Sequence, residues 1–223
     1  SGHIILGGTS EFTHGNYKII SDLIVNNLQI RHVRHVDSKQ CSNKSQHDDH
    51  LEINGPINPD TPYIVEKLLR RIKDSPNYCS TKTGKRFAVT VWLNSGGGYM
   101  EDGYKLGEIF RKHSVKTLIP SRGECYSSCA TAFLGGSFRL MNGVNSKLMF
   151  HAPYSDSSNY GRDISCASSD KKLLSYMKKM LNVTDGKFLY ERTMSYCSTS
   201  TGWTLNNDAA EIFEIIKDIL EDV

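Results

Sequence analysis

The segment around Ser127 has the residue types that covalent catalysis needs. It runs from Cys125 to Cys129, places Ser128 directly after Ser127, and stands where a predicted strand and loop give way to an apolar helix. A serine at a helix start can simply cap the helix. The same position suits a nucleophile, because the helix dipole and free amides stabilise negative charge on an attacked carbonyl oxygen. Two interpretations therefore stand, a helix cap or a nucleophile, with Ser128 as the rival nucleophile.

His151 could supply the base that such a serine needs. It directly follows the short predicted strand 148–150 and precedes Ala152 and Pro153. A histidine at a strand end can also be satisfied by backbone partners alone. However, active sites of open parallel sheets gather at the carboxyl ends of strands. A base there could reach a serine that the preceding crossover presents.

A run of three glycines, Gly96 to Gly98, could bind an anion. It comes directly after the apolar segment 87–93 and before a predicted helix, so its backbone N–H groups are uncovered at the positive end of a helix dipole. This arrangement suits a phosphate or a developing oxyanion, and a flexible tight turn is the plain alternative. The run fits neither the Walker loop nor the dinucleotide-binding fingerprint.

Strands and helices alternate from Leu51 onward, which predicts how these residues are held. The predicted strands are 51–57, 87–93, 115–119 and 148–150, and the predicted helices begin near residues 60, 99, 124, 171 and 207, the last two ending at 181 and 220. Such alternation predicts an α/β fold with mainly parallel sheets covered by helices. We expect a domain at 51–223 preceded by an N-terminal extension at 1–50.

The N-terminal extension is harder to interpret. Residues 17–30 have apolar residues at mixed spacing, which allows either a helix or a pair of strands. Residues 38–50 are polar and lack periodicity, so we expect a loop. The run His47 to His50 resembles a set of metal ligands, but no helix or strand frame is evident there, and we expect a solvated loop.

The composition excludes several classes of function. The chain has 223 residues, of which 38% are hydrophobic and 23% charged, with a formal net charge of +3. No apolar run approaches the roughly 18 residues of a membrane span. The basic residues are too few and too scattered to indicate nucleic-acid binding.

Six cysteines bear on the compartment in which the protein works. They are Cys41, Cys79, Cys125, Cys129, Cys166 and Cys197. Their spacing fits no zinc site, and we expect no metal and no cofactor. An even number of cysteines favours disulfides in a periplasmic or secreted protein, although the sequence has no signal-peptide pattern. Free buried thiols in a reducing cytosol are the alternative.

From about Leu51 to its end, the sequence resembles the Clp-protease/crotonase superfamily, and especially Clp-protease-like proteins of bacterial periplasms. Four segments in family order, 55–57, 94–98, 125–136 and 150–153, carry the likeness. They correspond to Gly-x-Ile, Asn-Ser-Pro-Gly-Gly, Cys-x-Ser-x-Cys with a later Gly-Gly, and apolar-His-x-Pro. The resemblance implies a Clp/crotonase-like fold of repeated ββα units.

The resemblance also implies roles for individual residues. Ser127 would be the nucleophile and His151 its general base. The backbone N–H groups of Ser128 and of Gly97 or Gly98 would form the oxyanion hole. These roles predict a serine hydrolase, most simply a peptidase that forms an acyl-enzyme on a peptide or protein substrate.

Two departures from the family pattern bear on activity. Gly96 replaces the family proline, which loosens the glycine turn. The family acid falls near Thr201 and Gly202, where no carboxylate stands. Asp185 and Asp208 are weak substitutes, so either another acid serves, or a Ser–His dyad operates, or the site is degenerate.

The remaining expectations concern the cysteines at the nucleophile and the partners. Cys125 and Cys129 are close enough for a disulfide across Ser127, and small buried thiols are the alternative. The family usually forms rings or stacked trimers, so a homo-oligomer is allowed. A non-catalytic peptide-binding relative and, less favoured, a crotonase-type acyl-CoA enzyme are the alternative functions.

Overall fold

The computed structural model describes residues 16–143, 145–156 and 164–217. Within them the chain forms strands and helices in the following order. They are β1 Asn16–Val25, β2 Leu28–Val36, β3 Asp48–Asn54, α3 Asp60–Asp74, β4 Thr90–Asn94, α4 Met100–Lys112, β5 Lys116–Ile119, β6 Glu124–Tyr126, α5 Ser128–Phe133, β7 Phe138–Met141, β8 Lys147–Phe150, β9 Tyr154–Asp156, β10 Ile164–Cys166, α6 Lys171–Met180, α7 Val183–Met194, β11 Trp203–Leu205 and α8 Asn207–Ile212.

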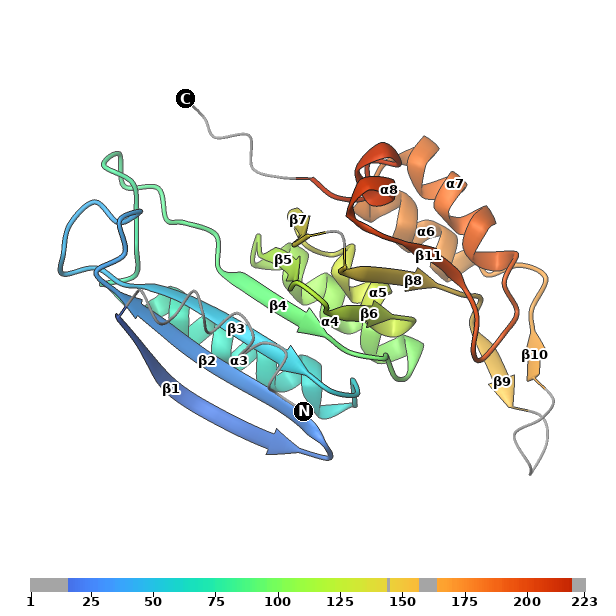
Figure 1. The fold of residues 1–223 in the computed structure, drawn as a ribbon, viewed down its shortest axis with the longest axis horizontal. Helices are drawn as coiled ribbons and strands as arrows, with labels where there is room; N and C mark the ends of the chain where they lie inside the picture. Colours follow the sequence, from blue (N-terminus) through green and yellow to red (C-terminus); the bar gives the residue numbers. More distant parts are fainter. Residues whose placement is uncertain (1–15, 144, 157–163, 218–223) are drawn as a thin grey trace.

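The strands form one large sheet and two small ones (Figure 1). The six-stranded sheet has the order β1-β2-β3-β4-β5-β7, and its last four strands are parallel. A three-stranded sheet, β11-β8-β6, holds β6 and β8 in parallel. The predicted α/β architecture with mainly parallel strands and covering helices is therefore confirmed.

Helix α3 shows how the apolar pattern builds the core. Its stripe of Val65, Leu68, Leu69 and Ile72 is buried in the main hydrophobic cluster. The same cluster contains apolar side chains of β2 and β3, such as Ile30 and Leu51. Because side chains alternate across a strand, the residues next to these in β2 and β3 lie on the opposite face of the sheet.

The predictions for the N-terminal and C-terminal parts have mixed outcomes. The segment 17–30 is a strand pair, since β1 and β2 form an antiparallel hairpin at the sheet edge, and β2 also pairs with β3. The division at residue 50 stays a prediction. The last helix is shorter than expected, because Glu214 takes a left-handed φ of 57° and Lys217 then bonds to Arg139 of β7. Helix α7 and strand β11 were not predicted.

The expectation of a solvated loop at 47–50 is wrong. Strand β3 begins at Asp48, and Asp49 is buried where β2 and β3 pair. Its carboxylate lies 2.6 Å from His32 Nε2, 2.7 Å from His47 Nδ1 and 3.1 Å from Arg34 Nη2. Burial alone would raise its pKa, but the hydrogen bonds from His32 and Arg34 hold the pKa of Asp49 at about 2. The sequence pattern predicted the strand only from Leu51 onward and missed its first residues, because those are polar and satisfy their hydrogen bonds across the two strands.

The opposite face of the same strand pair holds a second buried group. His50 stacks on Trp92 with ring centroids 4.7 Å apart, and its Nε2 lies 3.1 Å from Glu52 Oε1. Burial lowers the pKa of His50 to about 3 and raises the pKa of Glu52 to about 7. The two groups therefore change the free energy of unfolding with pH in opposite directions.

We expect His50→Asn to reduce the loss of unfolding free energy that wild type shows as the pH falls below 7. In the unfolded chain His50 binds a proton near pH 6.5, whereas the folded protein resists this down to about pH 3. The stability that neutral His50 contributes is therefore lost as the pH falls from 6.5 toward 3. One proton that binds only to the unfolded chain changes the slope of the free energy of unfolding against pH by up to about 1.4 kcal/mol per pH unit. Urea unfolding between pH 7 and pH 4 measures this slope.

Glu52→Gln is the matched control with the opposite sign. The folded pKa of Glu52 lies above its ordinary value, so its contribution is present below pH 4.5 and is lost as the pH rises through about 7. Its removal should make the free energy of unfolding fall more steeply as the pH decreases from 7 to 4.5. Equal slopes in wild type and both variants would contradict these pKa directions.

Candidate active site

Ser127 lies on a sharp turn between β6 and α5. Its backbone has φ 58° and ψ −122°, a left-handed φ that residues other than glycine seldom adopt. The Ser127 N–H donates to the carbonyl oxygen of Met149 at 2.9 Å, which fastens the turn to β8. A strained strand–turn–helix of this kind is the geometry that presents a nucleophilic serine.

Ser128 is the less accessible of the two serines. Its side chain is fully buried, and its Oγ has no hydrogen-bond partner among the described residues. A Cβ added at Gly103 of α4 would lie 2.9 Å from Ser128 Cβ, so α4 covers this side chain. Ser127 is half-buried and is the serine that a substrate could reach. The Ser128 N–H, in the first turn of α5, has no acceptor inside the helix.

His151 comes off the strand next to the one that ends at Ser127. In the parallel pair β6 and β8, Tyr126 lies opposite Met149, so Ser127 and His151 emerge at the same ends of neighbouring strands. No hydrogen bond within 3.5 Å joins these two side chains in the described part of the chain. Catalytic hydrogen bonds are often long in proteins without substrate.

The second ring nitrogen of His151 has a backbone partner. Nδ1 lies 2.9 Å from the carbonyl oxygen of Ala152, and the ring is buried. A carbonyl only accepts, so Nδ1 carries the proton in this contact, and in the neutral ring Nε2 keeps its lone pair. This is the tautomer that a general base in a serine hydrolase requires.

The glycine turn packs directly against Ser127. Gly97 has φ +106°, and a Cβ there would lie 2.7 Å from the Tyr126 carbonyl oxygen and 2.9 Å from Ser127 Cβ. The Gly97 N–H donates to Ser95 Oγ at 3.0 Å. The Gly98 N–H has no hydrogen-bond partner in the described residues, so of the two glycine amides expected to form the oxyanion hole, Gly97 and Gly98, it is the one that remains for an external oxygen.

All six cysteines are paired in the structure. The pairs are Cys41–Cys79, Cys125–Cys129 and Cys166–Cys197. The expected Cys125–Cys129 bond is present, with Cα atoms 5.1 Å apart, and both residues are fully buried. It joins β6 to the first turn of α5 and so closes a small ring around Ser127. The alternative of free thiols is wrong.

No carboxylate reaches the His151 ring in the part of the chain that the structure describes. Asp185 lies in the first turn of α7 and accepts from Asn182 Nδ2 at 2.6 Å, and Asp208 lies in the first turn of α8. A Cβ at Gly202 would lie 2.6 Å from the Phe150 carbonyl oxygen, so this position does adjoin the strand that leads to His151. The sequence allowed a backbone partner for His151 but could not point to the Ala152 carbonyl, because a backbone acceptor has no residue signature.

A cleft of about 590 Å³ adjoins the glycine turn. It is lined by Asn54, Gly55, Pro56, Asn94, Ser95, Gly96, Gly97, Gly98 and Glu124. The asparagines that end β3 and β4 join its walls, since Asn94 Nδ2 donates to Asn54 Oδ1 at 2.6 Å. In addition, Glu124 N–H donates to Asn94 Oδ1 at 3.0 Å. The cleft is thus built on the same loop that packs against Ser127.

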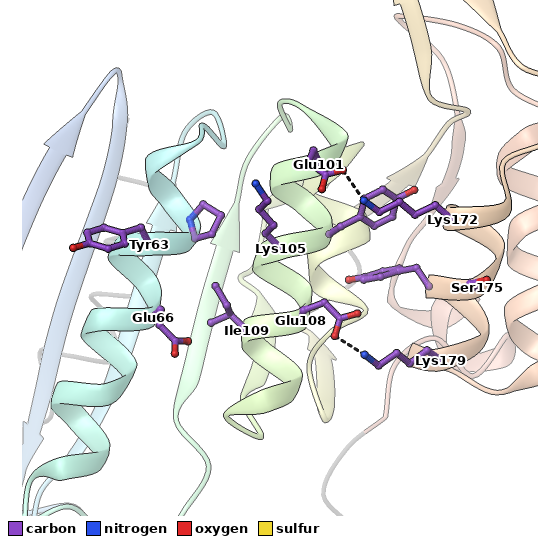
Figure 2. Close-up of a pocket in the computed structure, with 12 residues that line it drawn as sticks. Tyr63, Glu66, Glu101, Lys105, Glu108, Ile109, Lys172, Ser175 and Lys179 are labelled. Carbon is purple, nitrogen blue, oxygen red and sulfur yellow. Dashed lines mark hydrogen bonds and ion pairs between the residues drawn. The ribbon is translucent and has the colours of Figure 1, made fainter.

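A larger cavity of about 650 Å³ lies elsewhere, between α3, α4 and α6. Figure 2 shows its two ion pairs, Glu101–Lys172 and Glu108–Lys179, which join α4 to α6 at 2.7 and 2.6 Å. None of the residues lining it belongs to the arrangement around Ser127. The cleft at the glycine turn is therefore the better candidate for substrate.

Solved structures with the same fold are Clp-like. A mutant of ClpP1 from Listeria monocytogenes matches with 17% identity and a TM-score of 0.53, covering 75% of this chain and 88% of that chain. A mutant of the 1510-N membrane-bound stomatin-specific protease matches with 15% identity and a TM-score of 0.54, covering 77% and 78%. No protein-family model and no curated protein sequence matches. The chain therefore has a ClpP-like α/β fold.

Proposed function

We propose that this protein is a serine peptidase whose nucleophile is Ser127. The observation that carries the proposal is the strained turn at Ser127, with the glycine loop packed against it and His151 emerging from the adjacent strand. The ClpP-like fold and the name of one structural neighbour, a protease, support this choice at a coarser level.

The proposed mechanism uses two side chains and two backbone amides. His151 Nε2 accepts the proton of Ser127 Oγ as that oxygen attacks the carbonyl carbon of a peptide bond. The Ser128 and Gly98 N–H groups then hold the oxyanion, each contributing about 2.7–4 kcal/mol to the barrier reduction. His151 returns the proton to the leaving amine, and a water molecule that it activates hydrolyses the acyl-enzyme.

The Ala152 carbonyl takes the orienting place that a carboxylate occupies in a triad. It fixes the ring tautomer through Nδ1, at 2.9 Å. A neutral carbonyl stabilises the imidazolium less than a carboxylate does, so we propose a Ser–His dyad that is slower than a full triad. Asp185 and Asp208 would have to move to the ring to serve as a third member.

The disulfides bear on the compartment in which the protein works. Three disulfides are compatible with a periplasmic or secreted protein, and we propose this location. None of the helices in the described residues is both long and apolar enough to cross a bilayer. We further propose a peptide or protein substrate and assembly with further copies of the same chain.

A peptide-binding protein without catalysis is the second candidate. It is favoured by one observation, that no carboxylate contacts the His151 ring among the described residues. The same cleft would then hold a peptide without cleaving it.

Labelling with a fluorophosphonate probe tests the proposal. We expect wild type to be labelled at Ser127, identified by mass spectrometry of the modified peptide. Ser127→Ala should abolish labelling, whereas Ser195→Ala, an exposed serine after α7, should keep it. An unlabelled wild type, or a labelled Ser127→Ala variant, would overturn the assignment of the nucleophile.

A further inference from the structure

The cleft beside the glycine turn has an acidic wall and no basic one. Of the residues that line it, Glu124 alone is ionisable. Its side chain is exposed and forms no ion pair with a described residue. Lys147 lies opposite it in the β6–β8 ladder, but the two are not within ion-pair distance. Glu124 accepts a hydrogen bond from Tyr126 but has no ion-pair partner among the described residues, so its charge remains available to whatever enters the cleft.

The neighbourhood of Glu124 adds no second charged group to the cleft wall. Burial, the negative charge of Glu124 and a hydrogen bond to its carboxylate together raise the pKa of the Tyr126 hydroxyl to about 12, so Tyr126 stays neutral. The other walls are asparagine amides, Ser95 and glycine backbone, none of which carries a charge. A cation is thus the one kind of charged group that this cleft favours.

The cleft also adjoins the proposed nucleophile. Gly97 and Gly98 line it and belong to the turn that packs on Ser127. A peptide whose carbonyl carbon is within reach of Ser127 Oγ would therefore run past the cleft mouth. A side chain close to the scissile bond can enter it and approach Glu124.

From these observations we infer that the site selects peptides with a lysine or arginine side chain close to the scissile bond, and that Glu124 recognises the cation. This inference rests on the proposed peptidase function. It concerns substrate selection, which can be measured separately from cleavage.

Binding to the Ser127→Ala variant tests the inference without catalysis. A labelled peptide is varied to lysine, glutamine or glutamate at each position in turn, and its dissociation constant is measured by fluorescence anisotropy. We expect at least one position where lysine binds about five-fold tighter than glutamine, the strength of a partly exposed ion pair. Adding Glu124→Gln should remove this preference, and adding Glu124→Lys should reverse it in favour of glutamate.

The control is Glu211→Gln, a glutamate of α8 that is exposed and lies outside the cleft. It should leave the lysine preference unchanged. Equal affinity for all three peptides at every position, or no peptide binding at all, would overturn the inference. Lysine-dependent binding without hydrolysis by wild type would support it while overturning the peptidase proposal, and hydrolysis that ignores charge would do the reverse.

Discussion

Replacing His151 with alanine is expected to slow the acylation of Ser127 by about 10²- to 10⁴-fold, the usual contribution of a general base. The ring is buried, and the Ala152 carbonyl holds Nδ1 at 2.9 Å, so Nε2 is the nitrogen that can accept the serine proton. The second-order rate constant for fluorophosphonate labelling measures the loss. Binding of peptide by the variant should stay near the wild-type value.

Two aspartate variants give this prediction a sharp control. Asp185→Asn and Asp208→Asn should label at the wild-type rate, because neither carboxylate contacts the His151 ring. If either variant lost as much activity as His151→Ala, a carboxylate would be orienting the ring. The dyad with a carbonyl partner would then be the wrong description of the site.

Gly97→Ala is expected to lower the labelling rate at least about 10²-fold, the usual cost of misplacing a reacting group by about 1 Å. Its φ of +106° disfavours any side chain, and the new Cβ would lie within 3 Å of the Tyr126 carbonyl oxygen and of Ser127 Cβ. The turn would therefore have to move away from the nucleophile. Labelling kinetics and the melting temperature measure the two consequences.

Two other glycines separate the causes of this loss. Gly96→Ala meets no atom within 4 Å and its φ is not left-handed, so it should label like wild type. Gly84→Ala has φ +87° in open space, and it should lose stability through backbone strain while it keeps its labelling rate. If Gly97→Ala reacted as fast as Gly96→Ala, the packing of this loop on Ser127 would not matter for catalysis.

Strand β3 shows where prediction from the sequence failed. The alternation from Leu51 onward was informative because apolar side chains there face a common core. Asp49 and His50 are buried as well, but their partners are polar groups of β2 and Glu52. Burial of this kind leaves no hydrophobic period, so the segment looks like a loop. The final helix was predicted too long for a different reason, since the left-handed φ of Glu214 and the pairing of Lys217 with β7 end it, and neither leaves a sequence pattern.

The sequence could predict that Ser127, His151 and the glycine run lie near one another, because strand–helix alternation brings the ends of neighbouring parallel strands together. The tertiary structure decided the finer points. It buried Ser128 under α4, bound the Gly97 amide to Ser95, and set the Ala152 carbonyl against the imidazole. These contacts depend on local backbone direction and on packing between segments far apart in the chain. For that reason, no residue type or spacing along the sequence could have indicated them.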